Sequence, residues 1–262
     1  MAKHTTSVPT QWIFLRGLVR ESGHWGPFVP FFESQVPNAR VHLLDLPGNG
    51  ALYTLTSPTH LKAMVESCRQ QLRNAGLDPP YAVLALSMGA MVAVLWAHDY
   101  PHELVRQVLI NTSMRPYSAF YERLRPRNWV TILALLARTL LRRATGQQWE
   151  AAVLRMTTSG HHPQVLQAWL LLRTAHPVST ANALRQLCAA AIFKAPARRP
   201  LVPTLLLAST CDGLVSVRCS RGLAHAWQVP LLEHPHAGHD LALDDPHWLV
   251  QQLCHGGVTS GR

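Results

Sequence analysis

Five short apolar runs along the chain have the length and composition of buried strands, at residues 11–15, 41–46, 81–86, 107–110 and 204–208. Runs that are apolar on both sides, such as Val41-His42-Leu43-Leu44, are typical of strands in a parallel sheet whose two faces are both covered. The pattern therefore predicts a parallel sheet at the centre of the protein.

Stretches with helical periodicity separate these runs. One begins near Ser57 and Pro58 and continues to about residue 75, where Gly76 ends it. Another follows Ser87 and continues to about residue 100, where Pro101 stops it. Alternation of strand and helix is typical of the α/β class with a mostly parallel sheet, flanked by helices.

Residues 116–200 interrupt this alternation. Leu-, Ala- and Arg-rich stretches at 131–143 and 181–194 have amphipathic helical patterns, and no strand pattern lies between them. Six prolines punctuate the segment. We therefore expect a core formed by residues 1–115 and 201–262, with residues 116–200 inserted as a helical lid over the end of the sheet.

The composition of the 262 residues, 48% of them hydrophobic, fits a folded protein with a sizeable core. No apolar run reaches the ~18 residues that a membrane span needs, and the four apolar residues at 12–15 are too few for a signal peptide. The five cysteines are odd in number and show no C-x-x-C spacing, which favours buried thiols over disulfides or a zinc site. These features predict a cytoplasmic protein without a metal or other cofactor.

The net charge of +10 is concentrated in one part of the chain. Residues 116–200 contain twelve basic side chains against Glu122 and Glu150, whereas the remaining residues are balanced. Such an asymmetry indicates attraction of an anionic partner. Nucleic acid is disfavoured because no recognised binding motif accompanies the charge.

The sequence around Ser87 is the strongest indication of chemistry. A strand pattern ends at Leu86, Ser87 follows, and a helix begins at once, with small residues at Ala85 and Gly89. This A-x-S-x-G arrangement is a variant of the G-x-S-x-G turn, in which small neighbours let the backbone bend sharply enough to expose a nucleophilic serine. A helix-capping serine is the alternative interpretation.

An acid and a histidine follow in the order that such a serine requires. Asp212 comes just beyond the strand at 204–208, and His239 lies in a loop before the last helix. Asp45 is better explained as a brace for its own turn. Asp244 and Asp245 precede Pro246 and are expected to cap the last helix. His234 and His236 remain alternatives to His239 as the base. A metal site at His161-His162 is disfavoured because it lacks further ligands.

These motifs resemble the α/β-hydrolase superfamily over nearly the whole chain, and especially its small capped carboxylesterases. The residues that carry the resemblance are Gly17, Asp45-Leu-Pro-Gly48, Leu86-Ser-Met-Gly89, Tyr100-Pro101, Asp212-Gly-Leu-Val215 and Gly238-His239. The resemblance implies that Ser87 attacks a carbonyl, His239 transfers its proton and Asp212 orients the imidazole. It also implies an oxyanion hole formed by the backbone N–H groups of Leu18 and Met88.

One position departs from the family pattern, because Arg16 stands where a histidine usually precedes the oxyanion-hole glycine. The backbone N–H donors of the oxyanion hole do not depend on that side chain. The departure therefore concerns the conformation of this loop rather than the activity. His24 and Trp25 in the same loop are candidates for lining the substrate pocket. For His24, a surface position is an equally good interpretation.

A serine nucleophile predicts hydrolysis of an ester, thioester or amide through an acyl-enzyme. Dehalogenases and epoxide hydrolases of this fold use aspartate at that position, and an aminopeptidase would need acidic groups that the lid lacks. The alternative function is a non-catalytic member of the fold that binds a small ligand.

The basic lid suggests two partners. Arg138, Arg142 and Arg143 would draw an acidic acyl carrier protein or a coenzyme A thioester to the pocket, which we favour. Alternatively, Trp129, Ile132, Leu133, Leu135 and Leu136 beside these arginines would rest on anionic lipid as a peripheral contact.

Overall fold

The computed structural model describes residues 9–141, 143–160 and 162–255. In this part of the chain, six parallel strands form one sheet in the order β2-β1-β3-β4-β5-β6. The strands are β1 (Thr10–Leu15), β2 (Ala39–Leu44), β3 (Tyr81–Leu86), β4 (Leu104–Ile110), β5 (Thr204–Ser209) and β6 (Leu231–His234). The predicted α/β architecture is confirmed.

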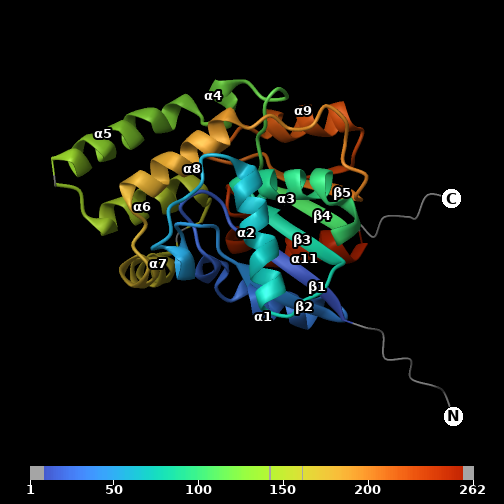
Figure 1. Ribbon diagram of the computed structural model, residues 1–262. Coiled ribbons are helices and arrows are strands. Elements are labelled where there is room, and N and C mark those ends of the chain that lie inside the picture. The colour runs from blue at the N-terminus through green and yellow to red at the C-terminus, as the bar shows by residue number, and fades with distance from the viewer. Residues whose placement is uncertain (1–8, 142, 161, 256–262) are drawn as a thin grey trace, which may run out of the picture.

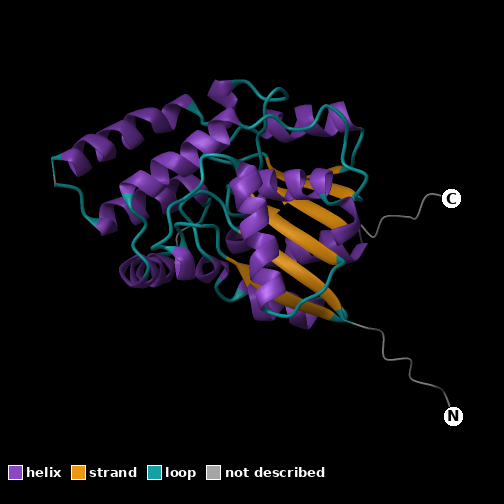
Figure 2. Cartoon of the chain, in the orientation of Figure 1, coloured by secondary structure: helices purple, strands orange, loops and turns teal. Residues whose placement is uncertain are grey.

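Helices cover both faces of the sheet, as Figures 1 and 2 show. The helices of the sheet region are α1 (Phe28–Gln35), α2 (Leu61–Asn74), α3 (Met88–Asp99), α9 (Val217–Trp227), α10 (Leu241–Asp244) and α11 (Pro246–His255), with short 3-10 turns η1 (Ser22–Trp25), η2 (Gly50–Leu52) and η3 (Pro101–Glu103). Alternating strand residues point into two separate cores. Ile13 and Val83 contact the α2–α3–α9 side, whereas Phe14 and Leu84 contact the α1–α11 side.

A group of helices lies between β4 and β5 in the chain and beside the sheet in space (Figure 1). These are α4 (Phe120–Arg123), the 3-10 turn η4 (Pro126–Asn128), α5 (Trp129–Leu140), α6 (Gly146–Thr157), α7 (Pro163–Ala175) and α8 (Thr180–Ile192). The loops at the carboxyl ends of the strands meet this group, since the backbone N–H of Asp240 donates to the carbonyl of Thr157 at 2.7 Å.

Several predicted boundaries were wrong by a few residues, and the short strand β6 was not predicted. β4 begins at Leu104 rather than at residue 107. β2 spans Ala39–Leu44 rather than 41–46, because Asp45 and Leu46 already belong to the turn that follows. α2 begins at Leu61 rather than near Ser57. Ser57 is fully buried, its hydroxyl donates to the carbonyl of Pro47, and its N–H donates to the side chain of Asn182. Ser57 therefore stabilises the loop before α2 and does not cap that helix.

The cysteines are only partly as expected. All five are free thiols, and Cys68 and Cys219 are buried, but Cys188, Cys211 and Cys254 are exposed. Among the described residues, no helix is long and apolar enough to cross a membrane.

Candidate active site

Ser87 occupies a strained turn between β3 and α3. Its φ of 57° and ψ of −115° lie in a region that side-chain-bearing residues rarely adopt. Such a conformation costs of order 1–3 kcal/mol and persists only where its surroundings enforce it. Here the Ser87 N–H donates to the carbonyl of Ile110 at 2.9 Å, and the Thr112 hydroxyl donates to the Ser87 carbonyl at 3.0 Å.

Close backbone approach requires glycine at position 89, and Gly17 is also tightly packed. A Cβ on Gly89 would lie 2.6 Å from the carbonyl oxygen of Arg16 and 2.7 Å from that of Leu15. A Cβ on Gly17 would lie 3.1 Å from the Cβ of Ser87. The loop after β1 is therefore packed directly against Ser87 and the first turn of α3.

His239 and Asp212 form a buried pair. The Nδ1 of His239 lies 2.7 Å from the Oδ2 of Asp212, and their side chains are 4% and 2% exposed. The other carboxylate oxygen accepts hydrogen bonds from the backbone N–H groups of Leu214 and Val215. Because the carboxylate accepts, Nδ1 of His239 is the donor in this contact, and Nε2 lies on the opposite side of the ring.

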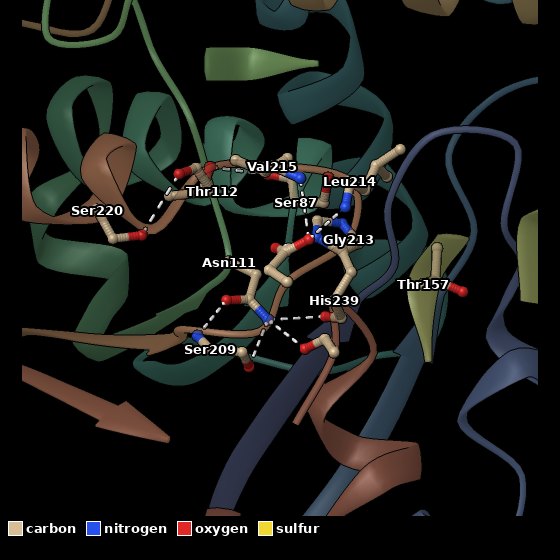
Figure 3. Close-up of polar contacts among 12 residues, drawn as sticks. Ser87, Asn111, Thr112, Thr157, Ser209, Gly213, Leu214, Val215, Ser220 and His239 are labelled. Atoms are coloured by element: carbon tan, nitrogen blue, oxygen red, sulfur yellow. Dashed lines mark hydrogen bonds and ion pairs between the residues drawn. The ribbon is translucent and has the colours of Figure 1, made fainter. Parts of the chain in front are cut away.

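Asn111 holds the loop that carries His239, a role that nothing in the local sequence pattern indicated (Figure 3). Its side-chain nitrogen donates to the backbone carbonyls of His239 at 2.8 Å and Gly238 at 3.2 Å, and its oxygen accepts from the N–H of Ser209. Asn111 directly follows Ile110, which accepts the N–H of Ser87. A short chain of contacts thus connects the serine turn to the histidine loop.

The predicted oxyanion-hole residues lie where the loop after β1 meets α3. Met88 is the first residue of α3, so its N–H has no partner within the helix. Leu18 follows Gly17 in a loop that is held by two further bonds. The N–H of Arg20 donates to the carbonyl of Gly17, and the N–H of Val19 donates to the side chain of Gln186.

The expectation that Trp25 lines the pocket does not fit its position. Trp25 is 3% exposed and belongs to the core on the α1–α11 side, where its ring contacts Phe14 and Phe28. An indole enclosed in this way packs the base of the loop and does not face a substrate.

His24 lines a small cavity between the η1 loop and helices α6 and α7. The cavity is lined by Val19, Arg20, Glu21, His24, Glu150, Arg173, His176 and Val178, and not by Ser87, Asp212 or His239. Burial, reinforced by the nearby Arg20 and Arg16, lowers the pKa of His24 well below its ordinary value. His24 is therefore neutral, and its Nε2 accepts from Arg20 at 2.8 Å.

Arg20 connects the η1 loop to the helices between β4 and β5. Its guanidinium donates to Glu150 of α6 at 2.6 Å and lies 4.4 Å from the ring of Trp169. Burial lowers the pKa of Arg20, and the opposing effect of Glu150 is smaller. Glu150 also pairs with Arg173 of α7 at 3.0 Å, so one carboxylate joins the loop to two helices.

The other acids have distinct structural roles. Asp45 accepts from the N–H of Ala51, six residues on, which is the expected brace of its own turn. It also accepts from the N–H of Ser22, so it connects the turn after β2 to the η1 loop, which was not expected. Asp245 accepts from the N–H of Trp248 and so caps α11, as predicted. The capping prediction was wrong for Asp244, which accepts instead from the N–H groups of Gly238 and Ser159. It therefore links the histidine loop to the segment after α6.

The remaining histidine candidates are engaged elsewhere. His234 contacts Asp245 at 3.0 Å through Nε2, and its Nδ1 accepts from the backbone N–H groups of His236 and Ala237. His162 lies 3.2 Å from Asp244, and His161 is outside the described residues. His234 is thus a structural support of the loop that presents His239.

The predicted recruiting arginines can be placed only in part. Arg138 lies on α5 and Arg143 just beyond it, and both are exposed, while Arg142 lies outside the described residues. The expected apolar contact face was wrong for Leu135, which is 8% exposed. Trp129 and Leu133 of the predicted face are exposed, as are Val130 on α5 and Leu141 just beyond the helix.

Comparisons with known proteins show the fold and the family of this chain. The chain is 26% identical over 245 residues to a pimeloyl-[acyl-carrier protein] methyl ester esterase of Xylella fastidiosa strain M23, covering 88% of this chain and 90% of that protein. Its fold is similar to an esterase from Exiguobacterium antarcticum, with a TM-score of 0.73, 14% identity, and coverage of 95% and 92%. A thermophilic esterase from Thermogutta terrifontis has a TM-score of 0.72, 19% identity, and coverage of 96% and 90%. Because the profile of the alpha/beta hydrolase family matches residues 12–252, this chain belongs to that family.

Proposed function

We propose that this protein hydrolyses a carboxylic ester or thioester through an acyl-enzyme on Ser87. The observation that carries the proposal is the buried 2.7 Å contact of His239 with Asp212, at the same end of the sheet as the strained turn of Ser87. A histidine fixed in this way has a defined tautomer and a free Nε2, which is what a general base needs.

In the proposed reaction, the Ser87 oxygen attacks the carbonyl carbon while His239 Nε2 accepts the hydroxyl proton. The tetrahedral oxyanion would be stabilised by the N–H groups of Leu18 and Met88, aided by the positive end of α3. The same proton then passes to the departing alkoxide or thiolate. Water next attacks the acyl-enzyme and gives one proton to His239. His239 returns that proton to the departing Ser87 oxygen as the carboxylic acid is released.

An esterase assay with activated esters of increasing acyl length tests this proposal. Ser87→Ala should lose at least about 1000-fold in kcat, the scale of removing a triad member. The control is Ser34→Ala, which removes an exposed hydroxyl on α1 and should keep the wild-type rate. A protein that binds esters with no turnover would instead be a non-catalytic ligand-binding member of the family.

We further propose that residues 116–200 act as a lid whose arginines recruit an anionic acyl donor, such as an acidic acyl carrier protein or a coenzyme A thioester. Several arginines of the lid have internal partners. Arg123 donates to the carbonyls of Ala190 and Ala191, and Arg173 pairs with Glu150. Arg138 and Arg143 are exposed and form no ion pair within the described residues, so they remain available to an anion.

The relative from Xylella fastidiosa is named for an ester on an acyl carrier protein, which supports this choice of partner. The exposed apolar side chains Val130, Leu133 and Leu141, which are 76%, 64% and 64% exposed, add an apolar surface beside the arginines. An anionic lipid surface would fit the same combination, and binding to lipid vesicles rather than to a carrier would be the contrary result. We place this activity in the cytoplasm.

A further inference from the structure

Arg16 is a cation in the interior of the protein. It directly follows β1, and its side chain is 4% exposed. The guanidinium donates to both carboxylate oxygens of Asp240, at 3.1 Å from Nη1 and 2.5 Å from Nη2, and lies 4.8 Å from the ring of Trp25. The Asp240 side chain is 3% exposed.

Each partner of this ion pair is covalently adjacent to a proposed catalytic element. Arg16 precedes Gly17 and Leu18, and its own carbonyl lies against the backbone of Gly89 at the start of α3. Asp240 directly follows His239. The pair therefore joins the oxyanion-hole loop to the histidine loop across a separation of 224 residues.

The geometry of the pair suits positioning more than stability. A guanidinium that makes two parallel bonds to one carboxylate fixes orientation as well as distance. Burying both charges has a high desolvation cost, so such a pair contributes little net stability although breaking it is strongly destabilising. The Nε of Arg16 has no hydrogen-bond partner within the described residues. The hydrogen bonds described for the guanidinium are therefore those to Asp240.

We propose that Arg16 and Asp240 form a positioning pair that sets the distance between the base on His239 and the oxyanion-hole N–H of Leu18. This inference rests on the proposed function of Ser87, His239 and Asp212. Neither residue of the pair is assigned a contact with the reacting atoms. Displacements of about 1 Å can reduce turnover by ~100-fold, so a fixed distance between base and oxyanion hole would matter for the rate.

A double-mutant cycle tests the pair, with kcat and KM for a small neutral ester and the melting temperature measured for each variant. Arg16→Met and Asp240→Asn each leave one buried charge unpaired. Both should lower the melting temperature and reduce kcat by about 10- to 100-fold, with KM within about 2-fold of wild type. The double variant has neither charge, so its melting temperature should recover while kcat stays as low as in the worse single variant.

A fold-preserving variant and a matched control complete the design. Arg16→Lys keeps the charge but cannot form the two-bond fork, so it should fold and still lose about 5- to 10-fold in kcat. Glu103→Gln, just before β4, breaks another two-bond pair, with Arg69 of α2, and should lower the melting temperature with kcat unchanged.

Three results would overturn the inference: kcat recovering together with the melting temperature in the double variant, losses that multiply in that variant, or a wild-type kcat for Arg16→Lys. Failure of the underlying function has a different signature, because Ser87→Ala would then retain wild-type activity. An inactive Ser87→Ala beside fully active Arg16 and Asp240 variants refutes the positioning pair alone.

Discussion

The side-chain amide of Asn111 donates a hydrogen bond to the backbone carbonyl of His239 at 2.8 Å, across a separation of 128 residues. Asn111 directly follows β4, the strand beside β3, and its backbone N–H donates to the carbonyl of Leu207 in β5, so the residue is fixed to the sheet. His239 lies on a loop. The contact therefore restrains the position of the loop that carries the proposed base.

Removing this contact should slow turnover more than it weakens folding. Asn111→Gly tolerates the positive φ of 46° but leaves two carbonyls without their donor. An unsatisfied buried group costs about 1–3 kcal/mol, and we expect kcat to fall by about 10-fold or more as the loop shifts. Steady-state kinetics and thermal melting measure both effects. Asn38→Gly, at an exposed position with a φ of 55°, is the control and should leave kcat unaltered.

Asp212→Asn should preserve the fold and reduce kcat by roughly 10³- to 10⁴-fold, because the amide no longer holds Nδ1–H of His239 in the required tautomer. The measurement is kcat for an activated ester, with circular dichroism to verify folding. Asp99→Asn, on the surface at the end of α3, serves as the control. A near wild-type rate for Asp212→Asn would assign the acid elsewhere, with Asp240 and Asp45 the next to be tested.

Reversing the charges of the lid should remove its long-range attraction for an anionic substrate. Changing Arg138, Arg142 and Arg143 to Glu should raise KM for a coenzyme A or carrier-bound thioester and hardly affect a small neutral ester. The effect should fade as salt rises, because charges ~10 Å apart are screened at about 0.1 M ionic strength.

A matched variant separates this attraction from a change in total charge. Reversing Arg40, Lys62 and Arg73, which are exposed outside the inserted segment, alters the net charge equally and should leave KM for the thioester unchanged. Equal losses on charged and neutral substrates, or no salt dependence for the thioester, would rule out recruitment by the lid.

The lowered pKa of His24 predicts a pH dependence of stability. Burial lowers its pKa below the ordinary value of 6.5, so below that pH the unfolded chain binds a proton that the folded protein does not. The contribution of His24 to stability is therefore complete above about pH 6.5 and is lost as the pH falls below it. Urea unfolding at about pH 7.5 and pH 5 measures the loss.

His24→Gln keeps an acceptor for Arg20 and cannot be protonated, so its stability should fall less than that of wild type over the same interval. Comparing the two proteins cancels the opposite contribution of Glu21, whose pKa is raised by burial. An identical decline in both would show that His24 is not the group responsible.

The sequence alone determined the fold class and the candidates for chemistry, because both depend on local patterns. Apolar runs mark strands, and a serine between Ala85 and Gly89 at a strand end is typical of the sharp turn that exposes a nucleophile. Parallel strands bring their following loops to one edge of the sheet, which is why Asp212 and His239 could be named before their 2.7 Å contact was seen.

The tertiary structure decided which side chains support that site. Asn111, Arg16 and Asp244 each bind a group more than five residues away in sequence, and Trp25 turned out to pack the core. Such contacts depend on the order of the strands and on where each loop lies above them, which residue spacing does not encode. A buried hydrogen bond forms where the folded chain brings a donor and an acceptor within reach of each other. Which groups come within reach is decided by the assembled sheet and loops.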